Sequence, residues 1–185
     1  MSEPKAPNIL LEKISLERVN DLHEAVLESR TAWFAEEMIP KPDLSIEELE
    51  AATKDLLNLW ENDEFYLFFI VDGFTNQLVG FTFLNHVNRQ YQIANLGYAV
   101  RTSRIGQGIA TAAARRLAQH GFEKLSFQRI EIVVQKDNRA SLKVAEKLGA
   151  VREGLLRNRL LVHGSPVDAY MHSLIPSDFG IHETA

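Results

Sequence analysis

Residues 95–100 (NLGYAV) and 105–111 (IGQGIAT) predict an apolar strand that leads, through a short polar turn, into the glycine-rich start of a helix. The first backbone N–H groups of a helix have no partner within the helix and carry the positive end of its dipole, so they form a ready site for a phosphate or a diphosphate. A Cβ at Gly106 or Gly108 would fill the space that a phosphate oxygen needs. The stretch therefore predicts a site for a nucleotide-like cofactor.

The length and composition fit one globular domain. The chain has 185 residues, 45% of them hydrophobic, and we expect a single domain over residues 1–185. The absence of cysteine excludes disulfides, thiolate metal ligands and a cysteine nucleophile. The N-terminus lacks the pattern of a signal peptide, and no run approaches the ~20 apolar residues of a membrane span. We therefore expect a cytoplasmic protein without a membrane segment.

The net charge of −5 argues against a general nucleic-acid binder, but the charge is unevenly distributed. Residues 1–100 hold 7 Lys and Arg against 17 Asp and Glu, whereas residues 101–159 hold 13 against 5 and include the glycine-rich stretch. A basic region favours a polyanionic small ligand, and an acidic region favours a cationic partner. Single basic side chains such as Arg115 are equally well explained as solvated helix surface.

Periodicity and turn signals predict the remaining elements. Strands are expected at residues 9–14, 65–71, 77–84, 92–100 and 129–134, at 151, and at 167–174; helices are expected after 20–21, after 45, over 107–122 and over 138–148. Leu22, Val26, Ser29, Arg30 and Trp33 recur at helical spacing in the first helix. The apolar stripe of the second helix is predicted to include Leu49, Ala52, Leu56, Leu59 and Trp60. The order of elements predicts an α+β fold, with a mixed, mostly antiparallel central sheet flanked by helices.

Turn and cap residues predict where some of these elements begin and end. Ser45, followed three residues later by Glu48, has the spacing of a capping box, and Gly149 is expected to end the last helix. Residues 163–166 are expected to form the turn before the last strand.

Two common phosphate-binding motifs do not fit the glycine-rich stretch. A P-loop requires a lysine directly after its second conserved glycine, and no lysine stands there. A dinucleotide-binding fingerprint requires a small residue where this chain has Thr111. Its acidic ribose ligand would have to be Glu131, at the start rather than the end of the next strand. We exclude the first motif and disfavour the second.

The chain resembles, across nearly its whole length, the GNAT superfamily of N-acetyltransferases. The acyl-CoA loop of that family begins with Gln or Arg, continues after two residues with Gly, and after one more residue with Gly or Ala. Gly108 and Ala110 match the last two positions, whereas Ile105 departs from the first, and Arg104 is a candidate for the missing positive charge. The other donors of the loop are backbone N–H groups that do not depend on side-chain identity, from Gly106, Gln107, Ile109 and Thr111.

A second segment makes the resemblance more specific. Residues 134–154 (VQKDNRASLKVAEKLGAVREG) resemble a block of the RimJ/RimL-type ribosomal-protein N-acetyltransferases, in which Asn and Ser stand three apart and are followed by Ala, Lys or Arg, and Gly. Further matches are Trp33, Leu96-Gly97-Tyr98, and Glu153-Gly154 with Arg157 and Asp168. Several separated matches in the right order are more specific than one glycine loop.

The resemblance implies the GNAT acyl-CoA N-acyltransferase fold, with acetyl-CoA as co-substrate. The strand that ends near Val100 would diverge from the strand that ends near Val134, and pantetheine would lie in the gap. The backbone around Tyr98 would bind the pantetheine amides and polarise the thioester carbonyl. Asn138 would hydrogen-bond the pantetheine arm, and Ser141 would protonate the leaving thiolate. The residues alone leave a second interpretation open, in which Asn138 is only a helix N-cap and Ser141 only the third residue of that helix.

The sequence does not identify a general base. Related members often have Glu where this chain has Asn95, and an amide cannot take a proton. The candidates are His86, His172, Asp168 and Glu37. At pH 7 an α-amine is about 10–20% neutral, whereas a lysine amine is only about 0.04% neutral. A site with a weak base therefore suits an α-amine better.

These patterns together predict direct acetyl transfer from acetyl-CoA to a primary amine in a ternary complex, with a protein N-terminal α-amine as the expected acceptor. Trp33 and residues 39–44 would border the acceptor site. The alternatives are a small-amine acetyltransferase, acting on a polyamine, an aminoglycoside or an amino acid, and a non-catalytic CoA-binding sensor. We expect a cationic acceptor, a monomer or homodimer, and neither nucleic acid nor a membrane as partner. The six histidines lack metal-ligand spacing, so no metal is expected.

Overall fold

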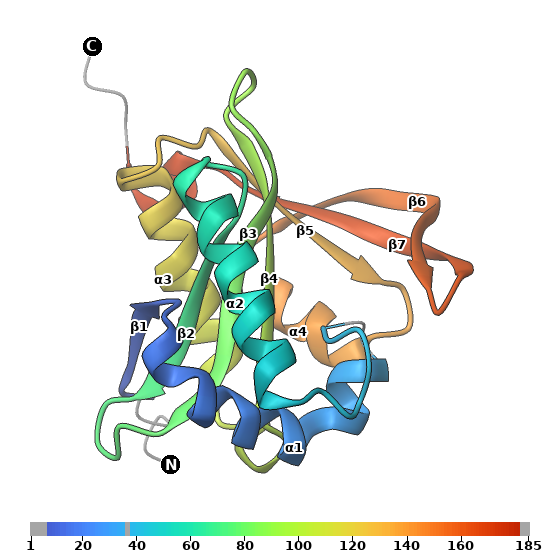
Figure 1. Cartoon of the computed structure of the whole chain (residues 1–185). Helices are drawn as coiled ribbons and strands as arrows, with labels where there is room; N and C mark the ends of the chain where they lie inside the picture. Colours follow the sequence, from blue (N-terminus) through green and yellow to red (C-terminus); the bar gives the residue numbers. More distant parts are fainter. Residues whose placement is uncertain (1–6, 36–37, 182–185) are drawn as a thin grey trace, which may run out of the picture.

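The computed structural model describes residues 7–35 and 38–181, and its centre is a seven-stranded sheet (Figure 1). The strands lie in the order β1-β2-β3-β4-β5-β7-β6. They are β1 (Ile9–Lys13), β2 (Tyr66–Asp72), β3 (Leu78–Asn88), β4 (Ile93–Val100), β5 (Arg129–Gln135), β6 (Val151–Val162) and β7 (Ser165–Leu174). All neighbours are antiparallel except β4 and β5, which are parallel. The predicted mixed, mostly antiparallel α+β sheet is confirmed.

Helices cover both faces of this sheet. The α-helices are α1 (Val19–Ala35), α2 (Ile46–Glu61), α3 (Ile109–Glu123) and α4 (Arg139–Leu148); short 3-10 helices are η1 (Leu16–Arg18), η2 (Thr102–Arg104) and η3 (Pro176–Phe179). One buried cluster joins α1 and α2 to β2 and β3, and a second joins α3 to the opposite face. None of the helices in the described residues has the length and apolar character needed to cross a bilayer.

The helix signals read from the sequence hold at the ends of two helices. The Ser45 hydroxyl accepts from the Glu48 backbone N–H (3.2 Å), and the Glu48 carboxylate accepts from the Ser45 N–H (2.9 Å), which completes the predicted capping box. Gly149 caps α4 in the left-handed conformation. In the predicted apolar stripe of α2, Ala52 is exposed. On α2 the buried position is Thr53, which lies one helical turn from Leu49 and therefore on the same face.

The last two strands are longer than the sequence predicts. Only residue 151 and residues 167–174 were expected, yet β6 extends to Val162 and β7 begins at Ser165. Figure 1 shows them as a long hairpin at one edge of the sheet. Most β6 side chains are exposed, so the strand lacks the alternation of apolar and polar residues that identifies a half-buried strand. The expected turn is present, with His163 and Gly164 at positive φ (48° and 77°).

The parallel pairing of β4 with β5 stops early, as the family resemblance implied. Paired positions run only from Ile93 to Asn95 on β4, opposite Arg129 to Glu131 on β5. Beyond this point β5 continues beside β7, and Figure 1 shows it diverging from β4. The Asn95 side chain lies at the fork, where its amide oxygen accepts from the Val133 N–H (3.4 Å). The residues of β4 that follow Asn95 are therefore not paired with β5.

Candidate active site

A cavity of about 930 Å³ occupies the fork between β4 and β5 and continues beneath α1 and α2. We call the part at the start of α3 the glycine end; it is lined by Gly106, Gly108, Ile109, Ala110 and Thr111. We call a second part of the lining, made of apolar side chains, the apolar end; it includes Met38, Ile39, Leu44, Phe65, Phe83, Leu160 and Leu161. Tyr98, Val100, Asn138 and Ser141 line the same cavity. The structure thus gathers most of the predicted site residues around one cavity.

The glycine end has the geometry of an anion site. Gly106 and Gly108 both have positive φ (82° and 77°), a conformation that residues with a Cβ rarely adopt. Gly108 is the N-cap of α3, and no side chain among the described residues caps this helix start. The first N–H groups of α3, at Ile109 to Thr111, are therefore left for a ligand. A Cβ on Gly106 would meet no atom of the described residues within 4 Å.

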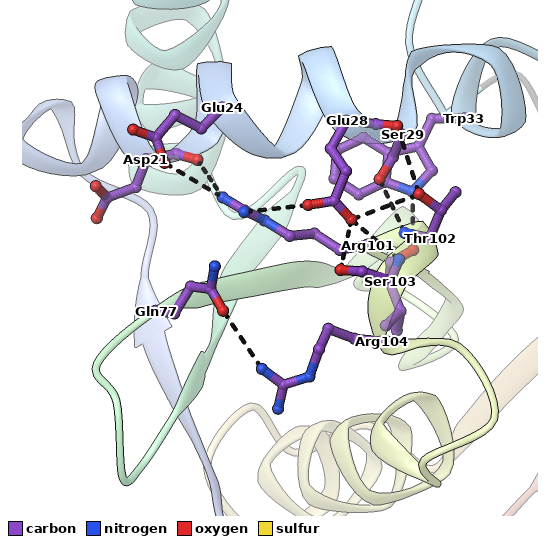
Figure 2. A network of polar contacts seen from close by, with 11 residues as sticks. Asp21, Glu24, Glu28, Ser29, Trp33, Gln77, Arg101, Thr102, Ser103 and Arg104 are labelled. Atoms are coloured by element: carbon purple, nitrogen blue, oxygen red, sulfur yellow. Dashed lines mark hydrogen bonds and ion pairs between the residues drawn. The ribbon is translucent and has the colours of Figure 1, made fainter.

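A network of polar contacts anchors the residues that precede this loop to α1 (Figure 2). Arg101 is 4% exposed, and its guanidinium lies 3.3 Å from the Glu28 carboxylate. That carboxylate also accepts from the Ser103 backbone N–H (3.0 Å) and hydroxyl (2.7 Å), while the Ser29 hydroxyl accepts from the Thr102 N–H (3.0 Å). Burial alone would raise the pKa of the Glu28 carboxyl, but the hydrogen bonds from Ser103 and the charge of Arg101 outweigh it and lower this pKa. The network fixes η2 and hence the start of the loop.

Arg104 has an ion-pair partner on β2. Its guanidinium lies 2.5 Å from the Asp72 carboxylate and also donates to the Gln107 side chain (3.0 Å). Figure 2 shows the side chain turned toward Gln77, in the loop between β2 and β3. The hydrogen bond from Arg104, with those from two backbone N–H groups, lowers the pKa of Asp72 to about 2. Arg104 therefore braces the loop with a neutralised charge, and its contact with a cofactor stays a prediction.

Two lysines that the sequence reasoning missed supply positive charge to the cavity. Lys143 and Lys147 lie one turn apart on α4, are exposed, and line the cavity. The sequence could have predicted them, because two lysines four residues apart lie on one face of a helix, and this helix also carries Ser141.

Tyr98 and Ser141 form the polar centre of the cavity. The Tyr98 hydroxyl lies 2.7 Å from the Ser141 hydroxyl. The Ser141 backbone N–H donates to the Asn138 side-chain oxygen (3.0 Å), so Asn138 is the N-cap of α4 and Ser141 its third residue. The cap uses only the amide oxygen, which leaves the amide nitrogen for a ligand. The interpretation of Asn138 as a helix N-cap and of Ser141 as the third helix residue is therefore correct. It is compatible with the predicted role of both residues in binding the cofactor, which stays a prediction.

Trp33 fixes the end of β4. Its ring is 2% exposed, packs edge to face on Phe81 (centroids 5.1 Å apart), and its N–H donates to the Val100 carbonyl (3.1 Å). The ring still lines the cavity. Because the indole N–H is already used, a role for Trp33 in acceptor binding rests on its ring and stays a prediction.

The structure separates the candidates for a general base. His86 is exposed on a bulge of β3, at φ 49°, and lines the cavity. His172 is buried in β7, where burial lowers its pKa, and it is absent from the cavity wall. Asp168 accepts from the Asn158 N–H (3.0 Å) and shapes β6. Glu37 lies outside the described residues. Within residues 7–35 and 38–181, no group of three possible metal ligands is found.

Residues 8–151 match the model of the acetyltransferase (GNAT) domain, and the chain belongs to this family. YdaF of Bacillus subtilis (strain 168), named as a candidate ribosomal N-acetyltransferase, is 33% identical over 110 residues, which are 60% of this chain and 58% of YdaF. Spermidine N(1)-acetyltransferase of Escherichia coli (strain K12) is 26% identical over 167 residues, 87% of this chain and 82% of that protein. The structure of RimL, a ribosomal L7/L12 alpha-N-protein acetyltransferase in complex with coenzyme A, superposes with a TM-score of 0.82 at 23% identity, covering 93% of this chain and 96% of RimL.

The relatives differ in how much of them is matched. The match with YdaF spans less than two thirds of that protein. The RimL structure establishes the fold of this chain. The match with the spermidine enzyme covers most of both proteins.

Proposed function

We propose that this protein, as one domain, transfers an acetyl group from acetyl-CoA to a primary amine, with a protein N-terminal α-amine as acceptor. One observation carries the proposal. The start of α3, which no described side chain caps, and the Tyr98–Ser141 hydroxyl pair line one cavity, where β4 is no longer paired with β5.

The residues present fit acetyl-CoA. The N–H groups of Ile109 to Thr111 would hold the diphosphate, with the ammonium groups of Lys143 and Lys147 nearby. The edge of β4 that is not paired with β5, before the Val100 carbonyl that Trp33 occupies, would hydrogen-bond the pantetheine arm as an added strand would. When bound, acetyl-CoA supplies the thioester that the amine attacks.

The chemistry requires one proton to leave and one to arrive. The neutral amine nitrogen forms a bond to the carbonyl carbon and loses a proton to a base or to water, the carbon–sulfur bond breaks, and the thiolate takes up a proton. A phenol, with an ordinary pKa near 10, is a stronger acid than an aliphatic alcohol, so the Tyr98 hydroxyl would supply this proton through the Ser141 hydroxyl, 2.7 Å away. An α-amine is partly neutral at pH 7 and therefore needs little help from a base. Among the predicted general bases in the described residues, His86 lines the cavity.

A second acceptor class is supported by the similarity to spermidine N(1)-acetyltransferase over 87% of this chain. Calorimetry with acetyl-CoA, followed by mass spectrometry of products from a panel of peptides, lysine derivatives and spermidine, tests both. Acetylation of peptide α-amines is the expected result. Binding of acetyl-CoA without any acetylated amine would indicate a cofactor sensor, and a covalent acetyl-enzyme would contradict direct transfer.

A further inference from the structure

We infer that Arg159 selects the acceptor: it disfavours polycations such as spermidine and admits a single amine next to an apolar group. The inference rests on the proposed acetyl transfer and names the substrate class of the same cavity.

The charged residues that line the cavity are all basic. Among the described residues on its wall there is no Asp or Glu, and the charged ones are Arg104, Lys143, Lys147 and Arg159. We expected a cationic acceptor because residues 1–100 are rich in Asp and Glu. None of those acidic side chains that the structure describes lines the cavity, and residues 36–37 are outside the described part of the chain. A polyamine entering the cavity would find like charges and no described carboxylate with which to pair.

Arg159 differs from the other three in its location. Arg104 is paired with Asp72, and Lys143 and Lys147 belong to α4, which carries the predicted pantetheine residue Asn138. Arg159 lines the cavity from the β6–β7 hairpin and precedes Leu160, which belongs to the apolar end. No hydrogen bond or ion pair holds its guanidinium within the described residues. Its charge is therefore available to act on an acceptor.

The fold fixes the position of Arg159 on a bulge. The pairing of β6 with β7 shifts between Leu156 and Leu160, so that residues 157–159 leave the ladder. The Asp168 carboxylate holds this bulge by accepting from the Asn158 N–H (3.0 Å), at a residue with φ 53°.

The tip of the hairpin and the aromatic rings complete the apolar end. The His163 ring lies 4.8 Å from the Phe34 ring of α1, centroid to centroid, which brings the tip of the hairpin against that helix. Phe65 and Phe83 stack with centroids 5.4 Å apart and line the same end. Such walls favour an apolar side chain next to the amine, since each buried methylene adds to binding. They also favour the neutral, nucleophilic form of that amine, because a low dielectric disfavours its charged form.

The test compares two acceptors with four proteins: wild type, Arg159→Glu, Arg159→Gln and Arg157→Glu. The acceptors are spermidine and a short lysine-free peptide that begins Ala-Leu. Arg157 is the matched control, because it is exposed on the same bulge but does not line the cavity. The wild type should prefer the peptide in kcat/KM. Arg159→Glu should shift the ratio toward spermidine by about 10-fold or more, and Arg157→Glu by less than about 2-fold. Arg159→Gln should shift it in the same direction by less.

Melting temperature and the KM for acetyl-CoA should be unchanged in all variants, which separates selectivity from folding and from cofactor binding. A ratio that is the same in wild type and Arg159→Glu, or a wild type that prefers spermidine, would overturn the inference and leave acetyl transfer intact. Failure of the wild type to acetylate either amine, despite binding acetyl-CoA, would remove the proposed function and this inference with it.

Discussion

Replacing Glu28 by alanine removes the carboxylate that holds the turn before the glycine end. The side chain accepts from both the N–H and the hydroxyl of Ser103 and forms an ion pair with Arg101, which is 4% exposed. Removing one partner of a buried ion pair costs about 3–5 kcal/mol of unfolding free energy, because the other charge is left without compensation. We expect about 3 kcal/mol, since the Asp21 carbonyl still accepts from Arg101 (3.2 Å) and the Glu28 side chain is 31% exposed.

Thermal unfolding and steady-state kinetics check this magnitude. For a chain of this length each kcal/mol lowers the melting temperature by about 2–4 °C, so Glu28→Ala should melt about 6–12 °C below the wild type. The KM for acetyl-CoA should rise while kcat at saturating cofactor changes little, because the loop is loosened and Tyr98 and Ser141 remain in place.

Glu24→Ala is the matched control. Its carboxylate lies 3.9 Å from the same guanidinium, but the side chain is 74% exposed, and exposed pairs contribute below about 1 kcal/mol. Equal melting temperatures for Glu24→Ala and Glu28→Ala would refute the reasoning, because Arg101 would then tolerate the loss of its nearest carboxylate.

Three further predictions concern the loop, the hydroxyl pair and pH. Gly108→Ala forces a Cβ into a left-handed conformation and should cost about 1 kcal/mol and raise the KM for acetyl-CoA; Gly164→Ala, with the same φ of 77° in the hairpin turn, should cost the same and leave KM unchanged. Ser141→Ala should lower kcat about 10–100-fold with little change in KM, and an unchanged kcat would return Ser141 to a structural role. Because the pKa of Asp72 is lowered to about 2 from 3.8, its bond with Arg104 stabilises the fold above about pH 4, and this contribution is lost as the pH falls toward 2. Urea unfolding of Asp72→Asn should therefore show a flatter decline over that interval, and a slope identical to wild type would contradict it.

Local signals in the sequence predicted the features that depend on neighbouring residues. The capping box of Ser45 and Glu48, the glycine at the end of α4 and the glycine-rich start of α3 each need contacts only within one turn. The fork between β4 and β5 came from the family resemblance, because nothing in the apolar pattern marks where parallel pairing stops.

Features that depend on distant residues could not be predicted from the pattern. Glu28 and Arg101 are 73 positions apart, and each alone is typical of a solvated surface charge. The length of the β6–β7 hairpin was missed because most of β6 is exposed and a strand without a buried face shows no alternation. The partner of Arg104 on β2 was missed for the same reason as that of Glu28.

Asn95 gives the fork a property that the more common glutamate would not. Its amide oxygen accepts from the Val133 N–H of β5, and its amide nitrogen donates to the Asn85 side chain on β3 (2.8 Å), so three strands meet at one uncharged group. A carboxylate there would lose or gain charge as acidity changes and would have no hydrogen to donate in its ionised form. The amide keeps the same bonds in acid and in base. The opening that accepts the coenzyme should therefore hold one width over the whole range in which the protein stays folded.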